Sequence, residues 1–345
     1  MDVLPLMLSG SAIFVFFAIC TFVYAKKTRY QPDKDGKFFP NEVLISVLYI
    51  IAAVMYPFFY INLGISSDTQ YMMYLSTLVI WVAEIGIFGF YILRERHICK
   101  GNPQLLADRD YVKIKADYRA NYHYDVKKDF KRKMLHLLAV VVIVAAWEMG
   151  RIMDSLDFQL FGMNAMAFYK WMSISVGLAF VIMFGIGDFV RLNYYAYLPP
   201  WAIKWFTSSL KEDELVTYIA SAPLVLGFVP FIFAPFQMFL SVALITSLAD
   251  AAASLVGKQF GKHHLSPTNK KTFEGLFAGG FAAFIIVALA MGTYPAAAVT
   301  SVIAMAAIAA SLFMTVDLTV KNYSDNIMNS LVCGAGMVLF LLFLV

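Results

Sequence analysis

The stretch GLFAGGFAAFIIVALAMGTYPAAAVTSVIAMAAIAASLFMTV, which runs from Gly275 to Val316, decides the fold. It holds 42 residues and no charged side chain. A helix rises about 1.5 Å per residue and a bilayer core is about 30 Å thick, so this run is too long for one crossing and fits two. Gly292, Tyr294 and Pro295 interrupt it and mark the turn. We therefore expect a helical hairpin across a membrane.

The composition extends this interpretation to the whole chain. Of its 345 residues, 61% are apolar and 14% are charged, whereas soluble domains carry about 25% charge. Three cysteines cannot build a disulfide framework or a zinc cluster. Further uncharged or nearly uncharged runs cover residues 3–25, 43–67, 71–93, 134–150, 165–187, 215–249 and 326–345, and the run 215–249 is long enough for a second hairpin. The sequence predicts an all-α, polytopic integral membrane helical bundle of about ten transmembrane helices.

The basic residues predict the orientation of these helices. With ten crossings, 25 of the 27 Lys and Arg residues fall in loops on one side, and only Arg151 and Lys170 fall on the other. Basic loops face the cytoplasm, so we expect both termini outside. The first run is long and is followed by Lys26 and Lys27, which is not typical of a cleavable signal peptide. Because the net charge of +4 is spread over these loops, we expect a lipid bilayer as partner and no nucleic acid.

The chain is expected to have three parts. Residues 1–100 form three N-terminal transmembrane helices without a catalytic role, and residues 134–345 form a seven-helix core. Between them, residues 101–133 carry apolar side chains at helical spacing, which predicts an amphipathic interfacial helix on the cytoplasmic side. A small helix packed on other loops is the alternative. The face in question consists of Tyr111, Ile114, Tyr118, Tyr122, Val126 and Phe130.

A polar segment at residues 250–275, between the two hairpins, is the most informative for function. Asp250, Ser254 and Gly257 lie at helical spacing and so share one face at a helix end. A carboxylate at the end of an apolar membrane helix is costly to bury and marks a functional site. Asp250 is therefore the first candidate for chemistry.

The rest of this segment is typical of a nucleotide site. Gly257 and Gly261 allow backbone amides to approach a ligand, Lys262 and Lys271 can neutralise phosphate oxygens, and Glu274 adds a second carboxylate for a hard cation. The alternative is that the lysines only mark a cytoplasmic loop and that the glycines only allow its turns. A Walker P-loop is excluded, because the spacing from Gly257 to Lys262 is one residue short and no Ser or Thr follows the lysine.

These residues resemble the CTP-dependent lipid kinase family, which includes dolichol (polyprenol) kinases, phytol and farnesol kinases and the yeast-type diacylglycerol kinase. The segment is similar to the family's Asp-Ala-x-Ala-Ser-x-x-Gly-x-x-x-Gly followed by Lys-Thr-x-Glu-Gly. Shorter motifs in the expected order extend the resemblance over roughly residues 128–340. By this resemblance, the site residues are Arg132, Lys133, His136, Asp188, Arg191, Glu214, Asp250, Ser254, Gly257, Gly261, Lys262, Lys271, Thr272, Glu274, Gly275, Asp325 and Asn326.

The resemblance implies phosphoryl transfer from CTP to a membrane lipid alcohol, most closely a polyprenol or dolichol, at the cytoplasmic face. It implies Asp250, Lys271 and Glu274 as catalytic residues, with Asp250 and Glu274 holding Mg2+. The other residues of the set would bind nucleotide or substrate. The membrane would be the plasma membrane of a prokaryote or the endoplasmic reticulum of a eukaryote, and the oligomeric state is open.

Three departures from the family pattern bear on the acceptor. Ala249 replaces a common Gly before the Asp, Ile219 with Ala220 replaces Thr-Gly, and Ser330 stands where Pro often occurs. Phytol, farnesol or diacylglycerol therefore remain alternative acceptors.

CTP:phosphatidate cytidylyltransferases have a similar loop, but they carry a long charged stretch further downstream. Here only Asp317, Lys321 and Asp325 are charged after Gly275, which favours the kinase. A transporter or a non-catalytic scaffold would also have about ten spans. A scaffold would not need the compact polar segment 250–275, and no internal repeat supports a transporter.

Overall fold

The structure is a computed structural model that describes residues 2–34, 36–121, 126–266, 269–295, 297–320 and 322–344. It confirms the all-α architecture. Within these residues, nine helices are long and apolar enough to cross a membrane, and the sheet content is one two-stranded hairpin. This multi-pass arrangement is that of an integral membrane protein.

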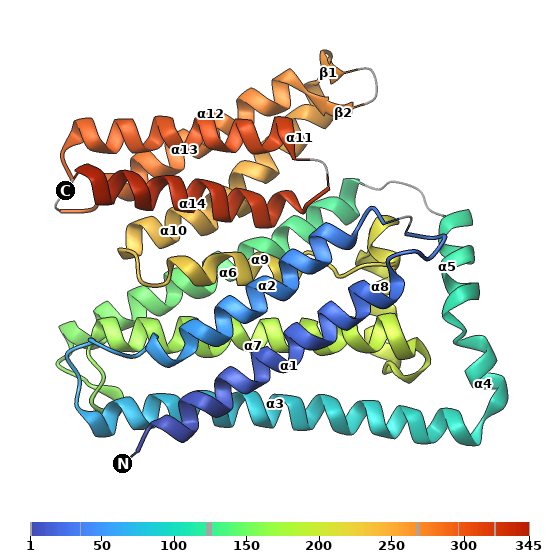
Figure 1. The fold of residues 1–345 in the computed structure, drawn as a ribbon. Helices are drawn as coiled ribbons and strands as arrows, with labels where there is room; N and C mark the ends of the chain where they lie inside the picture. The colour runs from blue at the N-terminus through green and yellow to red at the C-terminus, as the bar shows by residue number, and fades with distance from the viewer. Residues whose placement is uncertain are drawn as a thin grey trace. The chain divides into compact units, whose positions relative to one another are not determined.

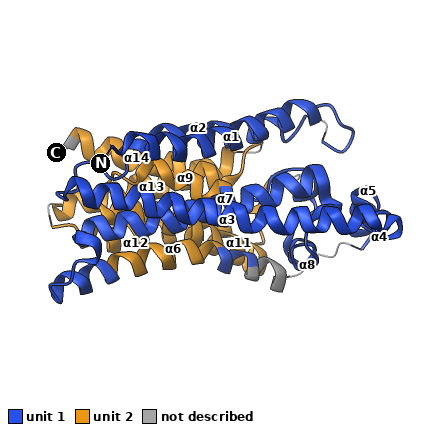
Figure 2. Ribbon diagram, turned by 90° about the horizontal axis from the view of Figure 1, so that it is seen from below, with its two compact units in different colours: residues 1–135, 149–222 blue, residues 136–148, 223–345 orange. Residues whose placement is uncertain are grey.

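The chain forms two compact units, which Figure 2 colours separately. Unit 1 comprises residues 1–135 and 149–222, and unit 2 comprises residues 136–148 and 223–345. Two helices have residues in both units: α6 (Val126–Ser155) and α9 (Ser221–Phe228). Figure 1 labels the helices and strands. The three-part division at residues 100 and 133 stays a prediction.

The remaining elements of unit 1 are α1 (Leu4–Thr28), α2 (Phe39–Met55), η1 (Tyr56–Phe58), α3 (Ser67–Gly101), α4 (Pro103–Asp108), α5 (Tyr111–Ala120), η2 (Leu160–Gly162), α7 (Ala165–Tyr194), η3 (Tyr195–Tyr197), α8 (Pro200–Ser209) and η4 (Asp213–Leu215). Those of unit 2 are η5 (Val229–Phe231), α10 (Phe236–Leu244), the π-helical turn η6 (Ile245–Ala249), α11 (Asp250–Phe260), β1 (His264–Ser266), β2 (Asn269–Thr272), α12 (Phe273–Gly292), α13 (Val299–Thr319) and α14 (Asp325–Leu344).

Helix α3 is longer than the nearly uncharged run, residues 71–93, that predicted it. It begins where Ser66 Oγ accepts a hydrogen bond from the Thr69 amide at 3.1 Å, a side-chain N-cap. Its 35 residues measure about 52 Å at 1.5 Å per residue, which exceeds a hydrocarbon core of about 30 Å. The nearly uncharged run therefore marks the crossing, and the helix continues beyond it through basic residues.

The interfacial helix predicted over residues 111–130 is interrupted, since α5 ends at Ala120 and α6 begins at Val126. Tyr111, Ile114 and Tyr118 pack against a buried cluster of unit 1 formed by residues between 190 and 219. Both tyrosines also donate hydrogen bonds, Tyr111 Oη to the Leu215 carbonyl at 2.5 Å and Tyr118 Oη to the Leu210 carbonyl. Helix α5 is thus packed on protein. The side chains of the rest of the face lie outside the described residues: Tyr122, Val126 and Phe130.

The two predicted hairpins differ in regularity. Helices α12 and α13 confirm the one at residues 275–316, and Gly280 lets them approach, because a Cβ there would lie 2.7 Å from the Met314 sulfur. In the hairpin at residues 215–249, the first arm is a helix of only 11 residues, Ser221–Phe231. The second arm continues through α10, η6 and α11 as one span, Phe236–Phe260.

Candidate functional site

The ammonium of Lys271 lies between carboxylates near the start of α12. Its Nζ is 2.5 Å from Asp317 Oδ1 and 3.7 Å from Asp325 Oδ2, and it also donates to the Asp317 carbonyl at 3.2 Å. We name Lys271, Asp317 and Asp325 the carboxylate–lysine cluster. Burial lowers the pKa of Lys271, but Asp325, Asp317 and Asp250 together raise it above its usual value of 10.5. The lysine is therefore a permanent cation beside the predicted catalytic carboxylate.

Asp317 was not among the site residues predicted from sequence. It is largely buried, at 8% exposure, near the end of α13. The signal that selected Asp250, a carboxylate at the end of an apolar helix, applies equally to Asp317. Its position in the sequence could therefore have identified Asp317 as a candidate site residue.

Glu274 stabilises the turn that follows α11. Its carboxylate accepts hydrogen bonds from the amides of Lys262 at 3.1 Å and His263 at 3.3 Å, and it lies 2.6 Å from His263 Nδ1. The Lys262 side chain itself is exposed. The metal-binding role predicted for Glu274 stays a prediction, and the structure adds a second use for the same carboxylate.

The predicted glycines bring α11 and α12 together. A Cβ on Gly275 would lie 2.6 Å from the Ala253 carbonyl oxygen, and one on Gly261 would lie 2.6 Å from the side chain of Thr272, the N-cap of α12. Thr272, 3% exposed, caps α12 by accepting the Gly275 amide at 3.2 Å. These contacts explain the glycines by close packing, and a contribution of their amides to nucleotide binding stays a prediction.

Asp250 is the first residue of α11 and directly follows the π-helical turn Ile245–Ala249. Such turns are rare and frequently occur at functional sites. The Ser247 hydroxyl in this turn donates to the His136 carbonyl at 3.2 Å, which fixes the turn against α6 within unit 2. His136 is buried, and Ser254 is half-buried one turn after Asp250.

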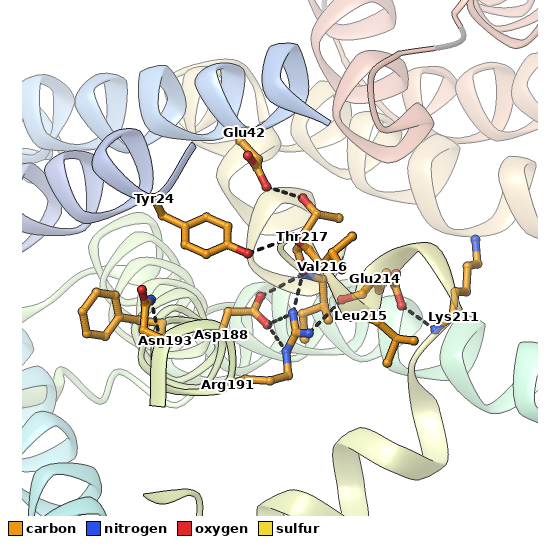
Figure 3. Close-up of polar contacts among 12 residues, drawn as sticks. Tyr24, Glu42, Asp188, Arg191, Asn193, Lys211, Glu214, Leu215, Val216 and Thr217 are labelled. Carbon is orange, nitrogen blue, oxygen red and sulfur yellow. Dashed lines mark hydrogen bonds and ion pairs between the residues drawn. The ribbon is translucent and has the colours of Figure 1, made fainter. Parts of the chain in front are cut away.

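A buried ion pair in unit 1 contains two more predicted residues. Arg191 donates to Asp188 Oδ1 from Nη2 at 2.7 Å and from Nε at 3.0 Å, and both side chains are at most 1% exposed. The same guanidinium donates to the carbonyls of Glu214 at 2.7 Å and Thr217 at 2.6 Å. Asp188 Oδ2 accepts the Ile219 amide at 2.8 Å. Figure 3 shows this pair beside residues Glu214 to Thr217.

Residues of α1, α2 and the loop between them support the same segment, although no role was predicted for residues 1–100. Glu42 Oε1 accepts a hydrogen bond from the Thr217 hydroxyl at 2.9 Å, and Tyr24 Oη donates to the Val216 carbonyl at 2.9 Å (Figure 3). Glu42 is also paired with Lys34 at 2.5 Å, and both are almost fully buried. The sequence offered a weak signal for this pair, a carboxylate at the start of an apolar run.

The other predicted residues lie in α6, in η4 and in the first turn of α14. Arg132 Nη1 is 4.0 Å from Glu214 Oε1 in unit 1, and Lys133 beside it is 7% exposed. Asn326 is 8% exposed in the first turn of α14. The structure thus brings the predicted residues together in two sets, one within each unit.

A divalent ion would need donors beyond the protein. Across the described ranges, no group of three or more His, Cys, Asp or Glu side chains is placed to hold a metal. Mg2+ in proteins is usually held by one or two carboxylates together with waters and substrate phosphates. The carboxylates around Lys271 fit that arrangement once a triphosphate is bound.

Comparison with known proteins gives one match. The model of a family described as the cytidylyltransferase family matches residues 130–320, more than half of the chain. No curated protein and no solved structure matches. The matched range contains every predicted site residue except Asp325 and Asn326.

Proposed function

The chain belongs to the cytidylyltransferase family, and from that premise we propose that it is a CTP-dependent kinase of long-chain lipid alcohols, with a polyprenol or dolichol as the first candidate acceptor. Membership indicates a CTP-using membrane enzyme. The segment Asp250 to Gly275 is similar in both reactions of this class, whereas Asp325-Asn326 and the scarcity of charge after Gly275 support a kinase.

The carboxylate–lysine cluster is the observation that carries the proposal. Its one cation, Lys271, is shared by Asp317 and Asp325, and Asp250 is close enough to affect the lysine. A phosphatidate acceptor would bring further negative charge beside these carboxylates, and like charges in a site of low dielectric repel strongly. A neutral hydroxyl brings none. The charge of the cluster therefore favours an alcohol as acceptor.

In the proposed reaction, the hydroxyl oxygen of the alcohol attacks the γ-phosphorus of CTP. The bond from that phosphorus to the β–γ bridging oxygen breaks, CDP leaves, and the hydroxyl proton passes to a carboxylate or to water. Positioning and charge neutralisation supply most of the catalysis in such transfers. Lys271 would neutralise phosphate oxygens, and Asp250 would hold Mg2+, which neutralises developing charge when bound. Asp188 and Arg191 would position the segment 214–219.

Two radiolabels distinguish the reactions within the family. The purified full-length protein is incubated in lipid nanodiscs with CTP and with polyprenol, dolichol, phytol, farnesol, diacylglycerol or phosphatidate. We expect label from γ-labelled CTP to enter an alcohol, and label from α-labelled CTP to stay in CDP. If α-label instead enters lipid with release of pyrophosphate, the protein is a cytidylyltransferase. Absence of transfer to every acceptor would contradict both activities.

A further inference from the structure

Asn329 is a buried amide that the proposed site does not yet use. It lies in α14 with no exposed surface, and neither its Nδ2 nor its Oδ1 has a hydrogen-bond partner among the described residues. Buried hydroxyls nearby differ in this respect: Ser330, for example, donates to the carbonyls of Asn326 and Ile327 in its own helix. Because buried polar groups are nearly always paired, an amide with two open positions indicates a ligand.

The register between α13 and α14 gives the depth of this amide. Cys333 Sγ contacts the Ala309 carbonyl, and the carboxylates of Asp325 and Asp317 both contact Lys271. These two pairs are eight residues apart on each antiparallel helix, so the position midway pairs Asn329 with Phe313. Asn329 is therefore one helical turn further into the bundle than the carboxylate–lysine cluster.

The same layer reaches the helix of Asp250. A Cβ added to Gly279 in α12 would lie 2.4 Å from the Phe313 ring and 2.8 Å from the Ala253 Cβ. Phe313, Gly279 and Ala253 thus lie at one level, and Asp250 is within one turn of Ala253 on α11. The π-helical turn before Asp250 also packs against α14. Asp250 consequently lies within about one helical turn of the level of Asn329 in unit 2.

We propose that Asn329 binds the hydroxyl group of the lipid alcohol. This assignment rests on the proposed function, and it names a binding residue that the motifs do not contain. The triphosphate is expected near Lys271, at the helix ends, because its charges are costly to bury deeper. A neutral hydroxyl on a long apolar chain can reach one turn further in. The Asn329 Nδ2 donates to the hydroxyl oxygen and leaves the hydroxyl proton free to face a carboxylate.

The decisive variant is Asn329→Leu, which keeps the number and branching of the side-chain heavy atoms and removes both polar atoms. We expect the KM for the alcohol to rise about 10- to 100-fold, as for one or two lost hydrogen bonds, with the KM for CTP unchanged. The melting temperature should stay equal or rise, because an apolar group replaces an unpaired buried amide. If the amide instead had only a structural role, Asn329→Leu would lower the melting temperature. If the leucine variant does not fold, Asn329→Ser tests the same point: it replaces the amide by one hydroxyl and should show a smaller rise in KM.

A second readout needs no catalysis. Added polyprenol should raise the melting temperature of the wild type without CTP and should not raise that of Asn329→Leu, while a polyprenyl hydrocarbon without a hydroxyl should affect both equally. Ser330→Ala, a buried neighbour bonded to its own helix, should behave as the wild type. An unchanged KM and an unchanged response to polyprenol in Asn329→Leu would overturn the assignment. Absence of transfer by the wild type would instead contradict the proposed function alone.

Discussion

The carboxylates around Lys271 stabilise its charge against the effect of burial. Its raised pKa means that the cluster contributes stability in full below the unfolded value of about 10.4 and loses it only as pH rises through the folded value. We predict that Lys271→Met lowers the melting temperature by the same amount at every pH from 6 to 9, and that the gap to the wild type closes above about pH 10.5. Thermal unfolding in detergent from pH 6 to 11 measures this. A gap that closes near pH 8 would contradict the permanent cation.

Asp250 is the residue on which the proposed chemistry depends most. We predict that Asp250→Asn lowers γ-phosphoryl transfer at least about 100-fold, because a carboxylate facing metal and phosphate loses its charge, while the protein stays folded in the membrane. The matched control is Asp157→Asn, since Asp157 is exposed and has a φ of 49°, which asparagine tolerates. Transfer rates and gel-filtration profiles of both variants test this. Near-full activity of Asp250→Asn would show that Asp250 is not a catalytic residue.

At the scale of elements, the segment Val216–Ala220 is not helical. It takes the place of the first turns of the hairpin that the sequence predicts over residues 215–249. Non-helical backbone at membrane depth is tolerated only where protein satisfies its polar groups. Arg191, Asp188 and Tyr24 do this for the carbonyls of Thr217 and Val216 and the amide of Ile219. The buried ion pair therefore takes the place of a helical hydrogen-bond ladder.

The pair of Glu42 and Lys34 extends this support to the N-terminal helices. Burial lowers the pKa of Lys34 and the Glu42 carboxylate opposes that shift, so Glu42→Gln leaves a buried cation without its partner. We predict that Glu42→Gln destabilises the protein by about 3 kcal/mol. The double variant with Lys34→Met and Glu42→Leu should recover most of the loss, because it buries no charge. Denaturant unfolding of the single and double variants measures the difference, and equal losses would show that the pair does not couple.

For the whole molecule, the helical architecture was predictable and the partners of its charges were not. The hydrophobicity of a run can be read from neighbouring residues. The sequence alone therefore predicts the hairpin at residues 275–316, and the structure confirms it. The contacts of Lys271 with Asp317 and of Thr217 with Glu42 join positions 46 and 175 residues apart. No periodicity encodes such pairs, and the predicted site residues include Lys271 of the first pair and neither residue of the second.

The number of crossings, and hence the sides of the two termini, depends on the short arm Ser221–Phe231. Its 11 residues measure about 16 Å as a helix, and the five residues before it can add at most about 16 Å. Together they match a hydrocarbon core of about 30 Å, so we predict that this arm crosses and that the chain makes ten crossings. Epitope tags on both termini should then be cleaved by protease from the same side of sealed vesicles, the side opposite the basic loops. Tags on opposite sides would show nine crossings, with Ser221–Phe231 entering and leaving by one face.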